Sequence, residues 1–540
     1  MKQYKKKIRY VKPALSALGF AIAVSNISGA YAAQYDVAGG LLEWNNIVRY
    51  NLGMRAEKQD RAIQTNPSTD EGTSSYDRGD IVTNRVDWYS EFGWDYQGKF
   101  GFRLSGSAWY DDAFNTRVKT GPGLENRGSY DNDRFSGFTK RYHRGLSGEI
   151  LDAHVYSNFM FGDTAGDIKV GRQTNLWGEA IIFSPHSVSY SQAPIDGLKA
   201  AAAPGADARE ISMPVGQVHV NLQPTPALAL AAQYFYEWEP TRLAQGGTYL
   251  AGTDFILEGP DKFSLAPGFD LRNRGLNKPK NRGDWGVSAR YFYEPFNATF
   301  GAYYRDFTER APFLSLDVAG GSYEALYPEN AKLYGLSFSK LVGKTSFGAE
   351  LVHRRNTALV SSIADGSDNV ARGDTWHFLV NGIRNFGPGA YWSSASLIAE
   401  VAGSHLEKVT KNESYFNFCD SDNPARRNAA RGCATRNAVQ GTIRFNPQWT
   451  AIAVGWDAGF STAFTYGLHG NSVVSGGGNE KVGSYSFGPS LTYNANHQFS
   501  LQYIDYLATK KNNPAGGIAY SNGSQLQDRG WLSFTYTGQF

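Results

Sequence analysis

Apolar and polar side chains alternate along much of the chain with a period of two. The stretch DWYSEFGWDYQGKFGFRLSGSAWYDD, residues 87–112, shows this pattern twice, with a break at Gln97-Gly98-Lys99. Trp88 and Phe102 belong to the apolar set, whereas Asp87, Glu91 and other polar residues take the positions between. Because successive side chains of a strand point to opposite faces, the pattern predicts two antiparallel strands joined by a tight turn.

Similar strand pairs recur along the chain, and they alternate with long polar connections. Segments 112–148, 239–283 and 407–434 are rich in Gly, Asn, Asp and Ser, which is typical of solvated loops. With a first strand near 44–55, a pair flanking 162–166 and a last strand ending at Phe540, we expect about 18 strands, with 16 as the alternative. The other predicted pairs are 216–223 with 228–238, 285–293 with 298–305, 332–341 with 346–354, 375–385 with 393–405, 439–445 with 450–457, and 482–493 with 499–506.

The first 32 residues have the composition of a secretory signal peptide. They hold six basic side chains and no acidic one, then an apolar stretch near residues 14–24, and they end at the small-x-small sequence Ala30-Tyr31-Ala32. The sequence therefore predicts a signal peptide over residues 1–32 and a barrel over residues 33–540. Without these 32 residues the chain has 47 basic and 50 acidic side chains, so it has no strong net charge.

The two ends of the strand pairs distinguish a membrane barrel from a soluble sandwich. Short turns on one side and long loops on the other are typical of an antiparallel up-and-down transmembrane β-barrel with extracellular loops. The last strand carries apolar residues at alternate positions and ends on Phe540, which resembles the signal that outer-membrane barrels present to their assembly machinery. We therefore predict an all-β protein in the outer membrane of a Gram-negative bacterium. Lipid, lipopolysaccharide and the barrel assembly machinery are its expected partners.

One segment interrupts the strand rhythm. Residues 174–215 lose the alternation and are rich in Pro, Gly, Ala and isolated charges. The chain here resembles the outer-membrane family DUF1302, whose members carry GRQ…WGE followed by a Pro-rich stretch. The resemblance implies an outer-membrane barrel without an established substrate. The matching residues are Gly171, Arg172, Gln173, Trp177, Gly178, Glu179, Pro204, Gly205, Arg209, Glu210, Pro214 and Val215.

A non-strand segment that leaves a barrel wall can fold into the lumen as a constriction or lie outside as a lid. Opposed charges across a narrow passage select solutes by charge and dipole. The alternative is that these charges only pair to hold the segment against the wall, which would not exclude a role in the pore. The predicted constriction residues are Arg172, Glu179, Asp196, Arg209 and Glu210, and the aromatic residues expected on the lumen face are Tyr89, Trp109 and Phe235.

The two cysteines, Cys419 and Cys433, lie in one predicted loop, and export to an oxidising compartment favours a disulfide between them. Neither a His nor a third Cys lies between them, so we predict no metal site. The sequence also contains no P-loop, no zinc-spaced cysteine and histidine set and no sustained basic face, so we expect no cofactor and no nucleic-acid partner. No histidine stands in an arrangement that activates a nucleophile, which argues against an enzyme.

Two functions remain. The first is a porin-like channel for passive or selective passage of small solutes, hydrophobic or amphipathic ones included. The second is a surface-display or adhesin-type barrel with a plugged lumen, since a fold does not decide function by itself. The sequence leaves the solute, the direction of transport and the oligomeric state open.

Overall fold

The computed structural model describes residues 33–202, 208–361, 364–365, 370–419, 432–512, 518–520 and 526–540. The predicted signal peptide, residues 1–32, lies outside the described residues, as do Pro204 and Gly205 of the family pattern.

Eighteen strands within the described residues form one closed antiparallel barrel. Each pairs with the strands before and after it, and the last, β26, pairs with the first, β2, which closes the ring. The wall strands are β2 (Gly40–Arg55), β3 (Ile81–Tyr96), β4 (Phe100–Asp111), β5 (Gly145–Phe161), β6 (Thr164–Gln173), β7 (Val215–Thr225), β8 (Leu228–Phe235), β11 (Trp285–Tyr293), β12 (Ala298–Phe307), β15 (Ala331–Val342), β16 (Thr345–Ala358), β18 (Arg372–Phe386), β19 (Ser394–Lys411), β20 (Asn437–Ala453), β21 (Trp456–His469), β22 (Gly483–Tyr493), β23 (His497–Leu507) and β26 (Trp531–Gln539).

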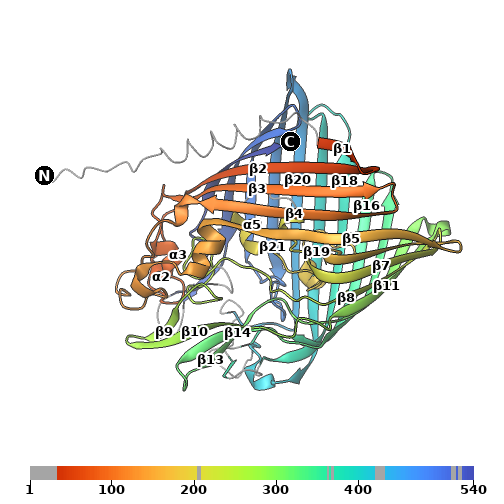
Figure 1. Ribbon diagram of the computed structural model, residues 1–540. Helices are drawn as coiled ribbons and strands as arrows, with labels where there is room; N and C mark the ends of the chain where they lie inside the picture. Colours follow the sequence, from red (N-terminus) through yellow and green to blue (C-terminus); the bar gives the residue numbers. More distant parts are fainter. Residues whose placement is uncertain are drawn as a thin grey trace.

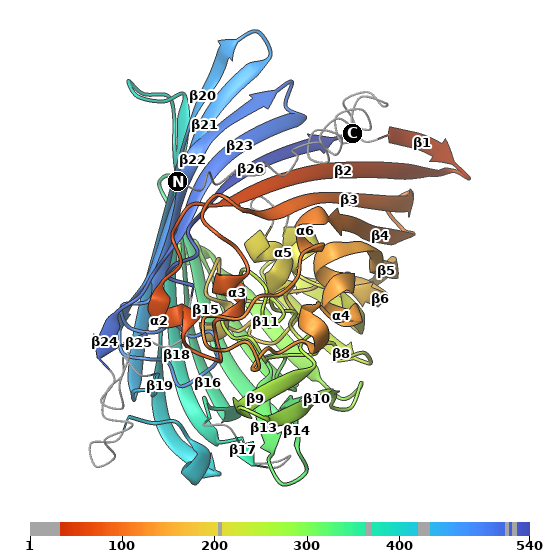
Figure 2. The ribbon, with the colours of Figure 1, turned by 90° about the vertical axis from the view of Figure 1, so that its left-hand side faces the viewer.

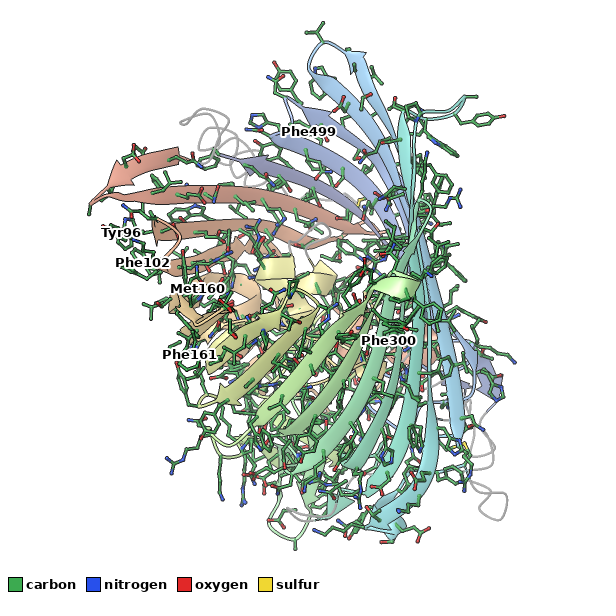
Figure 3. The ribbon with its side chains drawn as sticks, turned by 90° about the vertical axis from the view of Figure 1, so that its right-hand side faces the viewer. Tyr96, Phe102, Met160, Phe161, Phe300 and Phe499 are labelled. Carbon is green, nitrogen blue, oxygen red and sulfur yellow. A yellow bond between two sulfur atoms is a disulfide. The ribbon has the colours of Figure 1, made fainter. Side chains whose placement is uncertain are left out.

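The alternation of the sequence separates an apolar outer face from a polar inner one. Trp88 and Phe102 are 49% and 40% exposed on the outside, whereas Asp87 and Glu91 are buried inside. Figure 3 shows Tyr96, Phe102, Met160, Phe161, Phe300 and Phe499 projecting away from the wall. Closure of the sheet pairs the backbone groups of neighbouring strands with one another, and the apolar outer band faces lipid, as an outer-membrane barrel requires. The predicted barrel of 18 strands in an outer membrane is confirmed.

One predicted strand pair has the wrong turn. Segments 439–445 and 450–457 were expected as two strands, but β20 runs from Asn437 to Ala453 and turns at Val454-Gly455 into β21. The sequence Asn446-Pro447-Gln448 resembles a turn, yet Pro447 lies within β20, opposite Ala395 of β19. Pairing with the neighbouring strand therefore overrides the local turn signal.

Three further boundaries shift. The strand expected over 228–238 ends at Phe235, and parts of the expected loops 112–148 and 407–434 belong to β5 and β19. At the end of the barrel with the short connections, called here the turn end, β1 (Ala33–Val37) forms a hairpin with β2.

Long connections gather at the opposite end, called here the loop end, and carry secondary structure of their own (Figure 1). A five-stranded sheet of loop strands lies there, together with a two-stranded one and several short helices. These elements are β9 (Lys262–Ala266), β10 (Phe269–Asn277), β13 (Phe313–Asp317), β14 (Ser322–Leu326), β17 (Ala364–Asp365), β24 (Lys510–Asn512), β25 (Ile518–Tyr520), α2 (Arg61–Gln64), α3 (Glu71–Ser74) and α4 (Gly137–Thr139), with single turns at 112–114, 131–133, 140–144 and 413–415. A further turn at 294–296 joins β11 to β12 at the turn end.

The loops pack against one another. Arg529 is fully buried and donates hydrogen bonds to the backbone oxygens of Tyr249 and Ala251, so the last long loop holds the loop that follows β8. Among the described residues, no helix combines the length and the apolar character that a membrane span needs.

Candidate pore constriction

The segment between β6 and β7, called here the insert (residues 174–214), begins three residues after a glycine of β6. Gly171 has φ 134°, and a Cβ there would lie 2.3 Å from the backbone oxygen of Ala153. Only glycine adopts this conformation at no steric cost and leaves room for the neighbouring strand. The first residue of the family motif therefore lets β5 and β6 lie close together just before the insert begins.

Inside the barrel the insert carries a short turn at Ser184–His186 and two short helices, α5 (Gly197–Ala202) and α6 (Ala208–Ile211). Figure 2 shows both helices enclosed by the wall, beside β2, β3 and β4. The insert therefore lies in the lumen and not outside as a lid.

A buried glutamate on the far wall holds the first turn of the insert. Glu350 of β16 accepts hydrogen bonds from the backbone nitrogens of Glu179, Ala180 and Val188, the last two at 3.0 and 2.7 Å. Gly178, with φ 95°, stands where a Cβ would lie 2.4 Å from a carboxylate oxygen of Glu350. The second glycine of the motif therefore lets the chain approach this carboxylate closely.

A second glutamate continues the same anchoring. Glu400 of β19 accepts from the backbone nitrogens of Ile181, Ile182 and Phe183 at 2.7, 3.0 and 2.5 Å. Its side chain is 1% exposed, so these are charge-assisted bonds with little competing water. Together the two carboxylates bind six backbone N–H groups of the insert.

Apolar packing fixes the middle of the insert against the wall. Val188 and Tyr190 are buried in a cluster with Tyr303, Leu333 and Val352 of the wall strands, and Trp177 of the motif packs on it. Burial of a Val side chain contributes about 1.5–3 kcal/mol. The insert is therefore held by packing as well as by hydrogen bonds.

Polar contacts complete this attachment. His186 and His377 of β18 share a hydrogen bond of 3.0 Å between their Nδ1 atoms. The buried Arg305 donates to the backbone oxygens of Val188 and Tyr190 at 2.9 and 2.6 Å. The insert thus runs from β6 across to β16–β19 and returns past β12.

All five predicted constriction charges lie in or beside the insert, and each is in an ion pair. Arg172 and Arg209 are 34% and 44% exposed, whereas Asp196 and Glu210 are buried. Breaking a buried pair costs about 3–5 kcal/mol, because it leaves an uncompensated charge. The buried members therefore attach the insert, Arg209 lines the hollow described below, and Arg172 lies near the end of β6, opposite Ala153 and Gly216. The pairs are Arg172 with Glu237, Glu179 with Arg290, Asp196 with Arg242, Arg209 with Glu91, and Glu210 with Arg49.

The three predicted lumen aromatics face the interior, but each is buried and lies near a cation. The Arg209 guanidinium lies 5.9 Å from the ring of Tyr89, and the Lys199 ammonium lies 5.7 Å from Trp109. Phe235 is covered in the same way at 5.8 Å by an arginine of the loop after β12. These rings therefore support the cations that surround the lumen.

On the turn side of the insert lies a hollow of about 440 Å³. Arg103, Lys169 and Arg209 line it together with a single carboxylate, that of Asp152. Leu176 of the insert, 51% exposed, supplies an apolar surface. The hollow can therefore contact a solute through positive charge on one side and an aliphatic group on the other.

The disulfide between Cys419 and Cys433 is present, as predicted. It joins two points of one connection at the loop end, where Cys433 is buried. No cluster of three or more metal-ligating side chains occurs in the part of the chain that the structure describes.

The sequence interpretation missed Glu350 and Glu400. A usable signal existed, because an inward glutamate needs a partner in a barrel. Glu400 has Thr442 and Asn381 opposite it on the neighbouring strands, with no cation among them. An inward carboxylate without a cross-strand cation indicates that N–H donors from another segment satisfy it.

The fold and the insert define a transmembrane β-barrel whose lumen is crossed by a segment of its own chain. The chain belongs to the family described as "Protein of unknown function (DUF1302)", which it matches over residues 12–540. No curated protein sequence matches the chain.

Several solved barrels share some similarity. OccK1 (OpdK) of Pseudomonas aeruginosa is 11% identical, with 92% of this chain and 98% of that chain covered and a TM-score of 0.40. OccAB1 of Acinetobacter baumannii is 10% identical, with coverage of 92% and 96% and a TM-score of 0.43. The outer membrane channel DcaP of Acinetobacter baumannii is 11% identical, with coverage of 95% and 100% and a TM-score of 0.37. At these TM-scores the similarity carries no argument about function.

Proposed function

We propose that the protein is an outer-membrane channel for small amphipathic solutes, in which the insert forms the selective constriction. The observation that carries this proposal is the attachment of the insert across the lumen, with Arg172 and Arg209 left partly exposed. A solute that passes the insert comes close to these two guanidinium groups.

The charges of the hollow indicate which solutes pass most readily. Three cations and one carboxylate line it, which favours a solute with an anionic group. The exposed Leu176 suits an apolar body on the same molecule. A small amphipathic anion matches both features.

Ion selectivity in planar bilayers tests this proposal. Arg209→Ala removes one exposed positive charge from the hollow, while Arg103 still pairs with Glu91. The reversal potential in a salt gradient should shift toward cations, and the double variant with Arg172→Ala should shift further. The shift should be larger at low salt, where the Debye length grows from about 10 Å at 0.1 M to about 30 Å at 0.01 M.

Arg272→Ala is the matched control. Arg272 is also an arginine in an ion pair, with Asp131, but it lies on an exposed loop strand with 61% of its side chain accessible. Its removal should leave the reversal potential unchanged. A wild-type protein that inserts but conducts no ions would contradict the channel and support the surface-display alternative.

A further inference from the structure

The wall is incomplete beside β5. On one side β5 pairs with β4 from Gly145 to Ser157, but on the other side its pairing with β6 begins only at Ala153. Within the described residues, positions 145–152 therefore have a strand neighbour on one side alone. In Figure 1 β5 continues past the ends of β7 and β8 toward the loop end.

This unpaired edge lies at membrane depth. Ile150 stands opposite Gly106 of β4, in the middle of the outward run of β4 from Phe100 to Tyr110. Ile150 itself points outward and is 61% exposed. Irregular backbone at this depth is tolerated where it lines a cavity or is buried in protein.

The opening is covered by the segment around Arg242, in the loop after β8. This cover pairs with the insert and not with β5. Arg242 donates its backbone N–H to the oxygen of Ile195, and Gly197 donates to the oxygen of Arg242. The contact across to β5 runs through side chains, because Arg242 holds the carboxylate of Glu149 at 2.8 Å. The cover is thus attached to the lumen side and linked to the wall edge by an ion pair.

A hollow of about 790 Å³ lies between this cover and the edge of β5. Ile150 lines it from the outer face of the barrel, Arg172 lines it at the end of β6, and Pro214 lines it at the end of the insert. Pro214 also lines the smaller hollow on the turn side of the insert. The larger hollow therefore extends from the lipid-facing surface to the constriction.

The lining indicates the class of ligand. Aliphatic groups such as Ile150, Met213 and Leu243 alternate with charged side chains of both signs, among them Arg242 and Glu149, which pair with each other. Because Arg242 and Glu149 neutralise each other, this lining does not require a charged ligand. Pockets of this size bind drug-sized molecules.

We propose that this hollow is a lateral site through which an uncharged, mainly apolar molecule passes between the lumen and the bilayer. The inference rests on the proposed channel function and adds a second exit to it. Solutes with a charged group follow the lumen past the insert, whereas apolar ones cross the wall beside β5.

The uncharged dye N-phenylnaphthylamine tests this route, because it fluoresces when it reaches phospholipid and intact lipopolysaccharide slows its passage. Ile150→Trp places a large side chain at the outer rim of the hollow. Dye uptake by whole cells that contain this variant should be several-fold slower than with the wild type, while ion conductance in planar bilayers stays unchanged.

Val155→Trp is the control. Val155 also lies on the outer face of β5, with 59% exposure, but β6 pairs with the strand there. This variant should take up the dye at the wild-type rate.

A second pair of variants distinguishes a blocked lateral route from a misfolded barrel. Both native cysteines are in the disulfide, so Ile150→Cys and Val155→Cys each add a single free thiol that can be labelled with a bulky maleimide after folding. Labelling at 150 should slow the dye and labelling at 155 should not. Equal dye rates after labelling at 150 and at 155 would overturn the lateral route. Absence of ion conductance in the wild type would contradict the proposed channel function but not the lateral route.

Discussion

Replacement of Glu400 by glutamine should detach the insert from the far wall without unfolding the barrel. The two carboxylate oxygens accept four hydrogen bonds, three from the insert backbone and one from Asn381 at 3.2 Å. Ile182 and Phe183 share one oxygen, and Ile181 and Asn381 share the other. A glutamine keeps one acceptor oxygen. Its NH₂ group replaces the second oxygen and cannot accept the two hydrogen bonds that are made there.

The structure sets the size of this effect. Glu400→Gln loses two hydrogen bonds to a charged group, and such bonds contribute about 1.5–3 kcal/mol each. A conservative loss of about 3 kcal/mol raises the population of the detached insert roughly a hundredfold, since about 1.4 kcal/mol corresponds to a factor of ten.

Hydrogen exchange of the backbone amides at 181–183 measures this population. These amides should exchange roughly a hundredfold faster in the variant, while the amides of β19 and β20 keep their protection. Channel recordings should show more frequent excursions to a higher conductance. Unchanged exchange at 181–183 would refute the anchoring role of the carboxylate.

Glu407→Gln is the control on the same strand. Glu407 is 39% exposed and contacts His353 and Lys408 at the surface, where an ion pair contributes about 0–1 kcal/mol. Glu407→Gln should leave the hydrogen-exchange rates of the insert amides at 181–183 unchanged.

Three further predictions concern the loop end. Reduction of the bond between Cys419 and Cys433 should speed proteolysis of that loop but leave the heat-modifiable band of the folded barrel unchanged, because neither cysteine belongs to a wall strand; loss of the band would show that the loop supports the wall. Burial and a neighbouring carboxylate raise the pKa of Asp70 to about 7, so the folded loop binds a proton that the unfolded loop has released, and its stability falls as the pH rises. The protection factors of the loop amides, which correct for the intrinsic pH dependence of exchange, should be larger at about pH 5 than at about pH 8, and Asp70→Asn should remove most of this difference. Cysteines at Gly98 and Arg272 should differ in labelling by an impermeant reagent on whole cells, with label at 272 alone; label at 98 as well would contradict the predicted topology, and label at 98 alone would reverse the orientation.

The wall was predictable because its signal is local. Alternation at Trp88 and Phe102 gives the face of each strand directly, and each short connection gives a hairpin. The turn predicted at Pro447 was wrong, because this residue lies within a strand whose pairing with its neighbours fixes its register. Loop strands such as β13 and β14 have only five residues each, too few for alternation to mark them.

The lumen was predictable only in part. Isolated charges in and beside a non-strand segment predicted that Arg172 and Glu179 lie close to the insert, but their partners could not be assigned, because Glu237 and Arg290 come from distant strands and loops. The incomplete edge of β5 has no local signal at all. It follows from the point at which the pairing of β6 with β5 ends.

The attachment of the insert has a consequence for the order of assembly. The chain reaches Glu400 219 residues after Ile181, and β26 must be in place before β2 has its second neighbour. Because β26 is synthesised last, the insert can dock on β16 and β19 before the seam between β2 and β26 closes, or it can enter the closed ring through the loop end. Contacts of such long sequence separation form slowly. Docking of the insert therefore belongs with closure of the seam among the slow steps by which a nascent barrel is completed.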